Sequence, residues 1–362
     1  MSEELPIPDW VFEVKAWFPV KPEFDSPIVR EIIEHIRSTG EPHTWRGHTH
    51  TRPPDDAEIE YVGEFDLPKR YIEAKRFAPC PCCSPRHSKY GRGGKIAYFQ
   101  KEQVIRLIGP DCFKSINEQG HREAEDRYHQ AIERARTVEY LLQQLPRVPD
   151  IIRTIEQNLP IATAVDAVRH RLPTFLNEVL RIDLWEQVKD GQLKVTLEQS
   201  ETFLRRDQSE GTRTLHMQRV FASIAGYKLL RPRGRQTSLA YRQVLTALKK
   251  VNFGFDFRSR LVAMADTDRS ETARLFGQAL KRATGVTSEI ADIQMFFSPM
   301  NIANLKGWGR HAGSPCRFYF ELDGRNVLIG QTSSSHRRFV LPAAFFEPVR
   351  RMPDVLGVRK VA

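Results

Sequence analysis

Apolar residues recur at three- and four-residue steps through the middle of the chain. The longest such series lies on one helix face and consists of Ala124, Tyr128, Ala131, Ala135, Val138, Leu142 and Leu145. This spacing predicts an amphipathic helix that starts at Glu123 and ends before Pro146 and Pro149. Shorter helices are expected to follow over 150–158, 161–171 and 174–189. A short strand is predicted over 193–197, after Asp190-Gly191.

Three further helices are predicted from their apolar spacing and their end signals. They cover 215–225, which ends at Gly226, 239–251, which is preceded by Thr237-Ser238, and 268–283, which is closed by Gly285. The segment from Ala222 to Gly226 would then lie between two helices. Its spacing is similar to the turn of a helix-turn-helix.

The two ends of the chain show more alternation between apolar and polar positions. Near the start, we predict strands over 11–18 and 58–65, with a helix over 28–36 between them. Near the end, residues 316–322 and 326–330 flank Asp323-Gly324, which is a good hairpin signal. A further apolar segment covers 339–346. The pattern predicts a multidomain α+β protein with a mainly helical middle and a β-rich C-terminal part.

Changes in composition along the chain predict five parts. They are an acidic N-terminal domain (1–72), a cysteine-containing segment (73–122), a helical domain (123–200), a basic helical region (201–285) and a β-rich domain (286–362). An apolar fraction of 40% and a charged fraction of 28% are typical of globular proteins. No apolar run approaches the roughly 18 residues of a membrane span, and no signal peptide is recognised, so we expect a cytoplasmic protein without a membrane partner.

The net charge of +10 is unevenly distributed. Residues 1–70 hold fifteen acidic and eight basic residues, whereas residues 201–260 hold four acidic and thirteen basic residues. A basic stretch of this kind attracts polyanions, because phosphate neutralisation releases counterions. DNA or RNA is therefore an expected partner. An acidic protein partner, or the acidic N-terminal part of the same chain, is the other interpretation.

Within the basic stretch, the candidate phosphate contacts are Arg231, Arg233, Arg235, Lys249 and Lys250. The three arginines alternate around Pro232 and Gly234, so an extended loop can carry them along a phosphate backbone or into a minor groove. Ordinary solvation of a basic surface would produce the same composition. The pattern does not distinguish DNA from RNA and assigns no contact to a base.

Four of the five cysteines lie between positions 80 and 112. Cys80-Pro81-Cys82-Cys83 contains a Cys-Pro-x-Cys pair, a glycine-rich loop and an apolar stretch follow, and Cys112 comes after Gly109-Pro110. A Cys-x-x-Cys pair can direct two sulfurs at one tetrahedral ion, at about 2.3 Å each. We therefore predict one structural zinc ion, held by Cys80, Cys83 and Cys112. Three buried cysteines without a metal are the other interpretation.

This segment resembles treble-clef and zinc-ribbon fingers over about residues 78–122, and nothing outside it does. In these fingers a Cys-Pro-x-Cys knuckle is followed by a hairpin and by a ligand at the start of a helix. The chain departs from the pattern because no second Cys-x-x-Cys follows Cys112. His121 is the predicted fourth ligand, since Gly120 can break the helix before it. His87 and Cys82 are the alternatives.

A second histidine-rich segment contains His43, His48 and His50. Together with Asp55 or Asp56, a His-x-His pair can bind a catalytic metal for hydrolysis, whereas a polar surface loop is the plain interpretation. No phosphate loop, nucleophile elbow or dinucleotide fingerprint occurs. The sequence therefore favours a zinc-containing nucleic-acid-binding protein over an enzyme. A protein–protein adaptor and a metal-dependent hydrolase are the alternatives.

Overall fold

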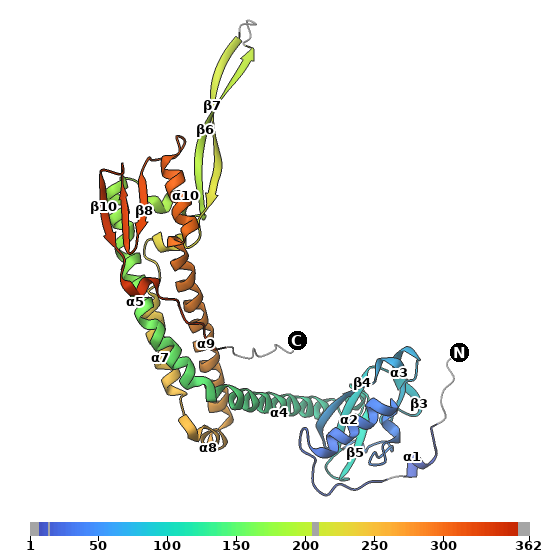
Figure 1. The fold of residues 1–362 in the computed structure, drawn as a ribbon. Coiled ribbons are helices and arrows are strands. Elements are labelled where there is room, and N and C mark those ends of the chain that lie inside the picture. Colours follow the sequence, from blue (N-terminus) through green and yellow to red (C-terminus); the bar gives the residue numbers. More distant parts are fainter. Residues whose placement is uncertain (1–6, 14, 205–209, 354–362) are drawn as a thin grey trace. The chain divides into compact units, whose positions relative to one another are not determined.

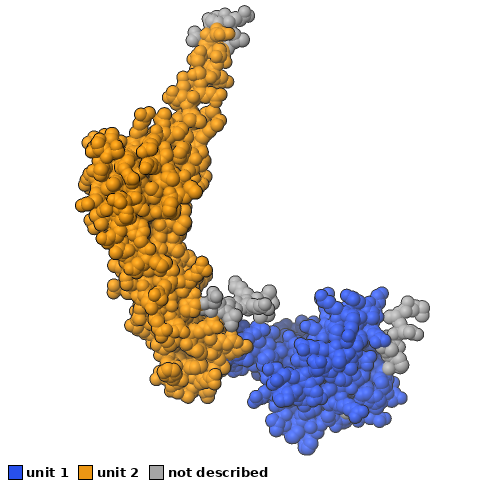
Figure 2. Space-filling view, in the orientation of Figure 1, with its two compact units in different colours: residues 1–138 blue, residues 139–362 orange. Residues whose placement is uncertain are grey.

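The computed structural model describes residues 7–13, 15–204 and 210–353. The chain forms two compact units, residues 1–138 and 139–362, which Figure 2 colours separately. Helices and strands occur in both units, and the predicted α+β class is confirmed (Figure 1). Among the helices of the described ranges, none combines the length and the hydropathy that a membrane span requires.

Unit 1 is built around a three-stranded antiparallel sheet with the strand order β1-β4-β5, and a second antiparallel pair joins β2 to β3. Its elements are α1 (Trp10–Glu13), α2 (Pro27–Thr39), η1 (Pro42–Thr44), β1 (Ile59–Asp66), α3 (Lys69–Glu73), β2 (Ala78–Cys80), β3 (Ser84–Tyr90), β4 (Gly93–Phe99), β5 (Val104–Ile108), η2 (Cys112–Ser115) and α4 (Glu118–Gln144), which contains the boundary between the units.

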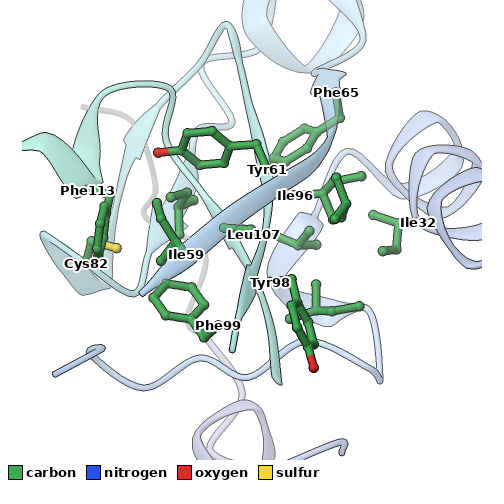
Figure 3. Packing of buried hydrophobic residues seen from close by; sticks show 14 of the residues in the cluster. Ile32, Ile59, Tyr61, Phe65, Cys82, Ile96, Tyr98, Phe99, Leu107 and Phe113 are labelled. Carbon is green, nitrogen blue, oxygen red and sulfur yellow. The ribbon is translucent and has the colours of Figure 1, made fainter. Parts of the chain in front are cut away.

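The core of unit 1 lies between α2 and this sheet. One face of α2 buries Val29, Ile32 and Ile36, and Figure 3 shows Ile32 among the side chains of the same core as Ile96 of β4. Gly40 ends α2 with a left-handed φ of 69°, and its N–H donates to the Ile36 carbonyl at 2.8 Å. This is a common helix end, because glycine adopts that conformation without strain. The predicted helix over 28–36 and strand over 58–65 are both confirmed.

The predicted strand over 11–18 is wrong. The chain there forms the short helix α1, in which the N–H groups of Val11 and Phe12 donate to the carbonyls of Pro8 and Asp9 at 3.0 Å. Backbone donors that are used locally cannot take part in a strand ladder. Farther along, the Phe18 N–H donates to the Gln103 carbonyl at 2.7 Å, and the Phe18 carbonyl accepts from the Tyr98 hydroxyl at 3.0 Å.

Unit 2 combines long helices with a three-stranded antiparallel sheet of order β10-β9-β8 and a separate ribbon of β6 and β7. Its elements are η3 (Leu145–Arg147), α5 (Val148–Leu180), α6 (Leu184–Val188), β6 (Gln192–Leu204), β7 (Glu210–Ser223), η4 (Tyr227–Leu230), α7 (Thr237–Lys250), η5 (Gly254–Asp256), α8 (Phe257–Ala263), α9 (Asp266–Gln294), η6 (Met295–Phe297), α10 (Pro299–Arg310), β8 (Tyr319–Asp323), β9 (Asn326–Gly330), β10 (His336–Val340) and η7 (Ala343–Phe346).

The helices predicted over 150–158, 161–171 and 174–189 are not separate. Residues 148–180 form the single helix α5, with Pro160 and Pro173 inside it, and the short α6 follows. An internal proline removes one helical hydrogen bond and crowds the preceding turn. The helix continues because one buried apolar stripe runs along its whole length, from Val148 to Leu176, and packing outweighs local propensity.

The helix predicted over 215–225 is also wrong, since these residues lie mainly in β7. Strands β6 and β7 pair from Gln192↔Ser223 to Leu204↔Glu210 and extend away from the helices of unit 2 (Figure 1). The helix-turn-helix interpretation of residues 222–226 therefore falls with it. The predicted strand over 193–197 is confirmed as the first part of β6. Residues 205–209, which belong to the predicted basic region, lie outside the described residues.

Two other predictions have different outcomes. The helix predicted over 268–283 exists as α9, but it passes through Gly285 to Gln294, because Val286, Ile290 and Ile293 continue its buried face. The C-terminal hairpin is confirmed: β8 and β9 pair across Asp323-Gly324, and Gly324 has a φ of 57°.

The start of α7 depends on Asp166 of α5. Its carboxylate accepts hydrogen bonds from the Thr237 and Ser238 N–H groups, each at 2.8 Å, and from both hydroxyls, at 2.9 and 2.6 Å. The N-cap residue of α7, Gln236, makes no side-chain cap hydrogen bond, so the cap is this tertiary contact. A carboxylate at this position also interacts favourably with the helix dipole.

We expect Asp166→Ala to destabilise unit 2 by about 1–3 kcal/mol, because it leaves buried donors of α7 without an acceptor. Asp183→Ala is the matched control, since Asp183 caps the short α6 through a single hydrogen bond from the Trp185 N–H at 3.0 Å. Denaturant unfolding measures both. Equal, small losses would show that the four contacts of Asp166 add nothing to an ordinary cap.

Candidate metal centre

Three cysteines of unit 1 converge at one point. Cys80 ends β2, Cys83 lies in the turn before β3, and Cys112 begins η2 after β5. Their sulfurs lie within 4.8 Å of one another, and the Cys83 and Cys112 sulfurs are 3.4 Å apart. The pairing of β2 with β3 closes the turn, and the β4–β5 hairpin returns the chain to it. The sequence prediction that these three residues meet is confirmed.

The spacing of the three sulfurs suits a small tetrahedral ion. Metal–sulfur distances of about 2.3 Å place tetrahedral sulfurs roughly 3.8 Å apart. The neighbouring backbone is shaped for this approach, because a Cβ on Gly109 would lie 2.6 Å from the Cys112 sulfur. The Gly109 N–H also points at the Cys80 sulfur, at 3.4 Å. These three residues can therefore hold a metal ion.

The protonation of the cluster favours a bound cation. Hydrogen bonds from the Cys112 and Cys82 thiols hold the pKa of Cys80 well below its usual value. The pKa values of Cys82 and Cys112 are raised, first because each donates to Cys80 and then because burial disfavours their charged forms. One thiolate thus forms readily and opposes the next. A divalent cation removes this opposition by replacing the protons between the sulfurs.

His121, the predicted fourth ligand, is not brought into this group of described residues. Its Nδ1 lies 2.6 Å from the Tyr61 hydroxyl, and its Nε2 lies 3.4 Å from the Glu125 carboxylate. Burial raises the pKa of Tyr61, so the phenol stays a donor and Nδ1 accepts. Lys95 closes the network by donating to Glu125 at 2.6 Å and to Glu64 at 3.2 Å.

The expectation that Gly120 breaks the helix before His121 is wrong. Gly120 and His121 both lie in the first turn of α4. The Asn117 side chain accepts a hydrogen bond from the Gly120 N–H at 2.8 Å, which is the contact of an N-cap residue. The helix thus starts before Gly120, and His121 can coordinate a metal only by giving up Tyr61 or Glu125.

The two alternative ligands lie in different surroundings. Cys82 is buried and its thiol is hydrogen-bonded to Cys80, so it lies next to the cluster although it is not one of its three members. His87 is exposed on β3. The fourth ligand therefore stays a prediction, with His121, His87 and Cys82 as its candidates.

In the second histidine segment, His48 and His50 are buried and both of their rings are fully hydrogen-bonded. The Leu107 N–H donates to His48 Nδ1 at 3.0 Å, His48 Nε2 contacts His50 Nδ1 at 2.8 Å, and His50 Nε2 contacts the Pro85 carbonyl at 2.8 Å. A carbonyl and a backbone N–H fix the two ends of this chain. Both rings must therefore be neutral, with the proton on Nε2.

This chain of contacts gives the loop a structural role. It connects Leu107 of β5 to Pro85, the second residue after Cys83, and so fixes the chain next to the cysteine turn. Burial, followed by the charges of His50 and His35, lowers the pKa of His43 to about 4. His48 and His50 could bind a catalytic metal only by breaking buried hydrogen bonds. The geometry therefore gives the hydrolase hypothesis no support.

The predicted phosphate contacts all lie in unit 2. Arg231, Arg233 and Arg235 are exposed on the loop between η4 and α7, and Lys249 and Lys250 are exposed at the other end of α7. A helix of this length places the two groups roughly 20 Å apart. The structure therefore brings the three arginines together and keeps the two lysines separate from them.

Sequence reasoning missed Arg169, which lies beneath the arginine loop. This residue is only 8% exposed, its Nη2 pairs with Glu289 of α9 at 2.8 Å, and its Nη1 donates to the Arg235 carbonyl. A signal was present, because Arg169 occupies a position of the apolar stripe that includes Val165, Val168 and Leu172. A charge in a buried stripe needs a partner.

No known protein family, curated protein or solved structure matches this chain.

We expect the purified protein to contain about one metal ion per chain and Cys112→Ser to contain much less, because the three thiolates act as one site. Elemental mass spectrometry measures the content. Cys316→Ser is the matched control, since this half-buried cysteine lies in unit 2, outside the cluster. Metal in neither protein, or equal amounts in both, would contradict the site.

The fourth ligand can be separated from the hydrogen-bond network. We expect His121→Ala and Tyr61→Phe to destabilise unit 1 similarly, by about 1–3 kcal/mol, because each leaves a buried polar group unpaired. Both should retain the metal. A chelator competition, run beside His87→Ala and Cys82→Ala, measures metal affinity. A large loss of affinity in His121→Ala alone would identify His121 as the ligand.

Proposed function

We propose that this chain is a zinc-containing nucleic-acid-binding protein, in which unit 2 contacts phosphate groups and the zinc ion braces unit 1. The observation that supports the proposal is a set of exposed cations without counter-charges. Within the described residues, Arg231, Arg233, Arg235, Lys249 and Lys250 make no ion pair. Phosphate is the anion that such groups bind in nucleic acids, with release of counterions.

Zinc is the proposed metal because of the donors that surround it. Thiolate ligands favour zinc over magnesium or calcium. The d-electrons of zinc impose no coordination geometry, so the short turn can bind the ion without adopting a special arrangement. A site of mostly thiolate ligands is structural rather than catalytic. The ion would connect the β2–β3 turn to the start of η2, two segments that a small sheet alone holds weakly.

The arginine loop is suited to phosphate in its chemistry and in its rigidity. A guanidinium group can bind two phosphate oxygens at once. The loop that carries these groups is fixed by Arg169, which donates a hydrogen bond to the Arg235 carbonyl. Of the three carboxylates that the described residues place near the loop, Asp166 is occupied by the start of α7 and Glu289 by Arg169, which leaves Asp292. The loop therefore presents positive charge that its own surroundings do not neutralise.

A protein adaptor with an acidic partner uses the same cations and stays the second candidate. It differs from the first in one measurable respect. A nucleic acid presents phosphates at regular spacing regardless of its sequence, whereas an acidic protein presents one particular surface. Binding to unrelated oligonucleotides at low salt separates the two.

We expect the protein to bind both a random-sequence DNA duplex and a single strand at low salt, with affinity falling steeply as salt rises. Replacing Arg231, Arg233 and Arg235 together by alanine should weaken binding and reduce the slope of log K against log salt by about 2–3. Fluorescence anisotropy at graded salt measures both quantities.

The charge-matched control replaces Arg258, Arg260 and Arg274, which are exposed elsewhere in unit 2. It removes the same net charge, so a general effect of charge would lower the slope equally. Lys249→Ala with Lys250→Ala tests the second group separately. No binding to either nucleic acid by the unaltered protein would reject the proposal and favour the adaptor.

A further inference from the structure

Two adjoining cavities lie beside the arginine loop of unit 2. The first has a volume of about 450 Å³ and lies between the loop and α5, where Pro173, Thr174 and Asn177 line it. The second has a volume of about 580 Å³ and lies between the loop and α9, where Gly285 and Ser288 line it. Both are lined by the same four residues, Arg169, Arg231, Gly234 and Arg235.

Arg169 is the floor that the two cavities share. Its Nη groups are used by Glu289 and the Arg235 carbonyl, but the buried Nε has no partner among the described residues. The loop lies directly on this side chain, because a Cβ on Gly234 would be 2.8 Å from the Arg169 Cδ. A buried N–H without a partner is unfavourable, and the side chain that carries it lines both cavities.

The charge around both cavities is positive. The first is lined by four arginines and one carboxylate, Asp166, which caps α7. The second is lined by three arginines and Lys228 against Glu289 and Asp292, and Glu289 is already paired with Arg169. Arg233 turns the loop with a left-handed φ of 52°. An anionic ligand with at least two charges suits this arrangement.

The shape of the cavities restricts that ligand further. Volumes of this size are typical of sites for small molecules. A duplex roughly 20 Å wide is too wide for its phosphates to enter a cavity between a loop and a helix. A single strand can, since its backbone is flexible. We propose that the two cavities hold consecutive nucleotides of one nucleic-acid strand, whose phosphates bind Arg231 and Arg235. This inference rests on the proposed function of the same loop.

The lining residues also predict how such a strand is recognised. Among the described residues that line the two cavities, His170 is the only one with an aromatic ring. Base stacking on phenylalanine, tyrosine or tryptophan therefore does not contribute. Single-strand binding without stacking depends on phosphate and is strongly salt-sensitive. Thr174, Asn177 and Gln236 offer hydrogen bonds to sugar or base edges in the first cavity.

The test fills the cavities without changing their charge. Thr174 of α5 and Ser288 of α9 are exposed helix positions that line one cavity each. We expect Thr174→Trp and Ser288→Trp each to weaken binding of a 20-nucleotide oligodeoxythymidine at least about tenfold, and to leave binding of a 20-base-pair duplex unchanged. Thr163→Trp, at an exposed position of α5 outside both cavities, is the matched control and should bind both probes normally.

The possible outcomes are distinct. Normal single-strand binding by both filled variants, with loss in the triple arginine variant, overturns the cavities but leaves the proposed function standing. A strand that binds only when it carries a 5′-phosphate, whatever its length, overturns the consecutive-nucleotide arrangement in favour of a terminal phosphate. If the unaltered protein binds neither probe, the proposed function fails and the inference fails with it. Helical content by circular dichroism shows that each variant is folded.

Discussion

The arrangement of unit 2 depends on one buried guanidinium. Arg169 pairs with Glu289 of α9 and donates to the Arg235 carbonyl of the loop, so a single side chain of α5 fixes the distance between three segments. A buried ion pair of this kind adds little net stability, because desolvation offsets much of the attraction. Removing one partner, however, would leave the other charge buried. The pair therefore specifies where the arginine loop lies more than how firmly unit 2 is folded.

Unit 1 also neutralises the cations that it buries. Lys95 pairs with Glu64 and Glu125, and Arg106 pairs with Glu102. The buried rings of His48 and His50 are neutral, and their nitrogens are used for hydrogen bonds. The cysteine cluster brings three sulfurs together that can hold a metal ion. The chemistry that unit 1 offers is thus the binding of a metal ion, and its polar interior supports that site.

The sequence allowed prediction of features that short segments determine by themselves. The cysteine spacing, the helix that follows Ser26-Pro27 and the Asp323-Gly324 hairpin each depend on neighbouring residues. The length of α5 does not depend on neighbouring residues alone. Its two prolines locally oppose a helix, and burial of its apolar face against the rest of unit 2 maintains it. Strand β7 was mistaken for a helix, since its alternating Leu215, Met217 and Phe221 are interrupted by polar residues. The meeting of Arg169 with the loop, 66 positions along the chain, could not be predicted from spacing at all.

The contrast between the two units bears on what the basic stretch is for. If a high content of arginine served only solubility, the cations would be expected to alternate with acids on the surface, as they do along α4, where Glu118 pairs with Arg122. At residues 231–235 the chain instead places three exposed arginines beside a fourth that is buried. Two of the three carboxylates that the described residues place beside them are used elsewhere, since Asp166 caps α7 and Glu289 pairs with Arg169, which leaves Asp292. Concentrating positive charge in this way costs folding energy through mutual repulsion, and binding of the polyanion proposed for this loop would offset that cost.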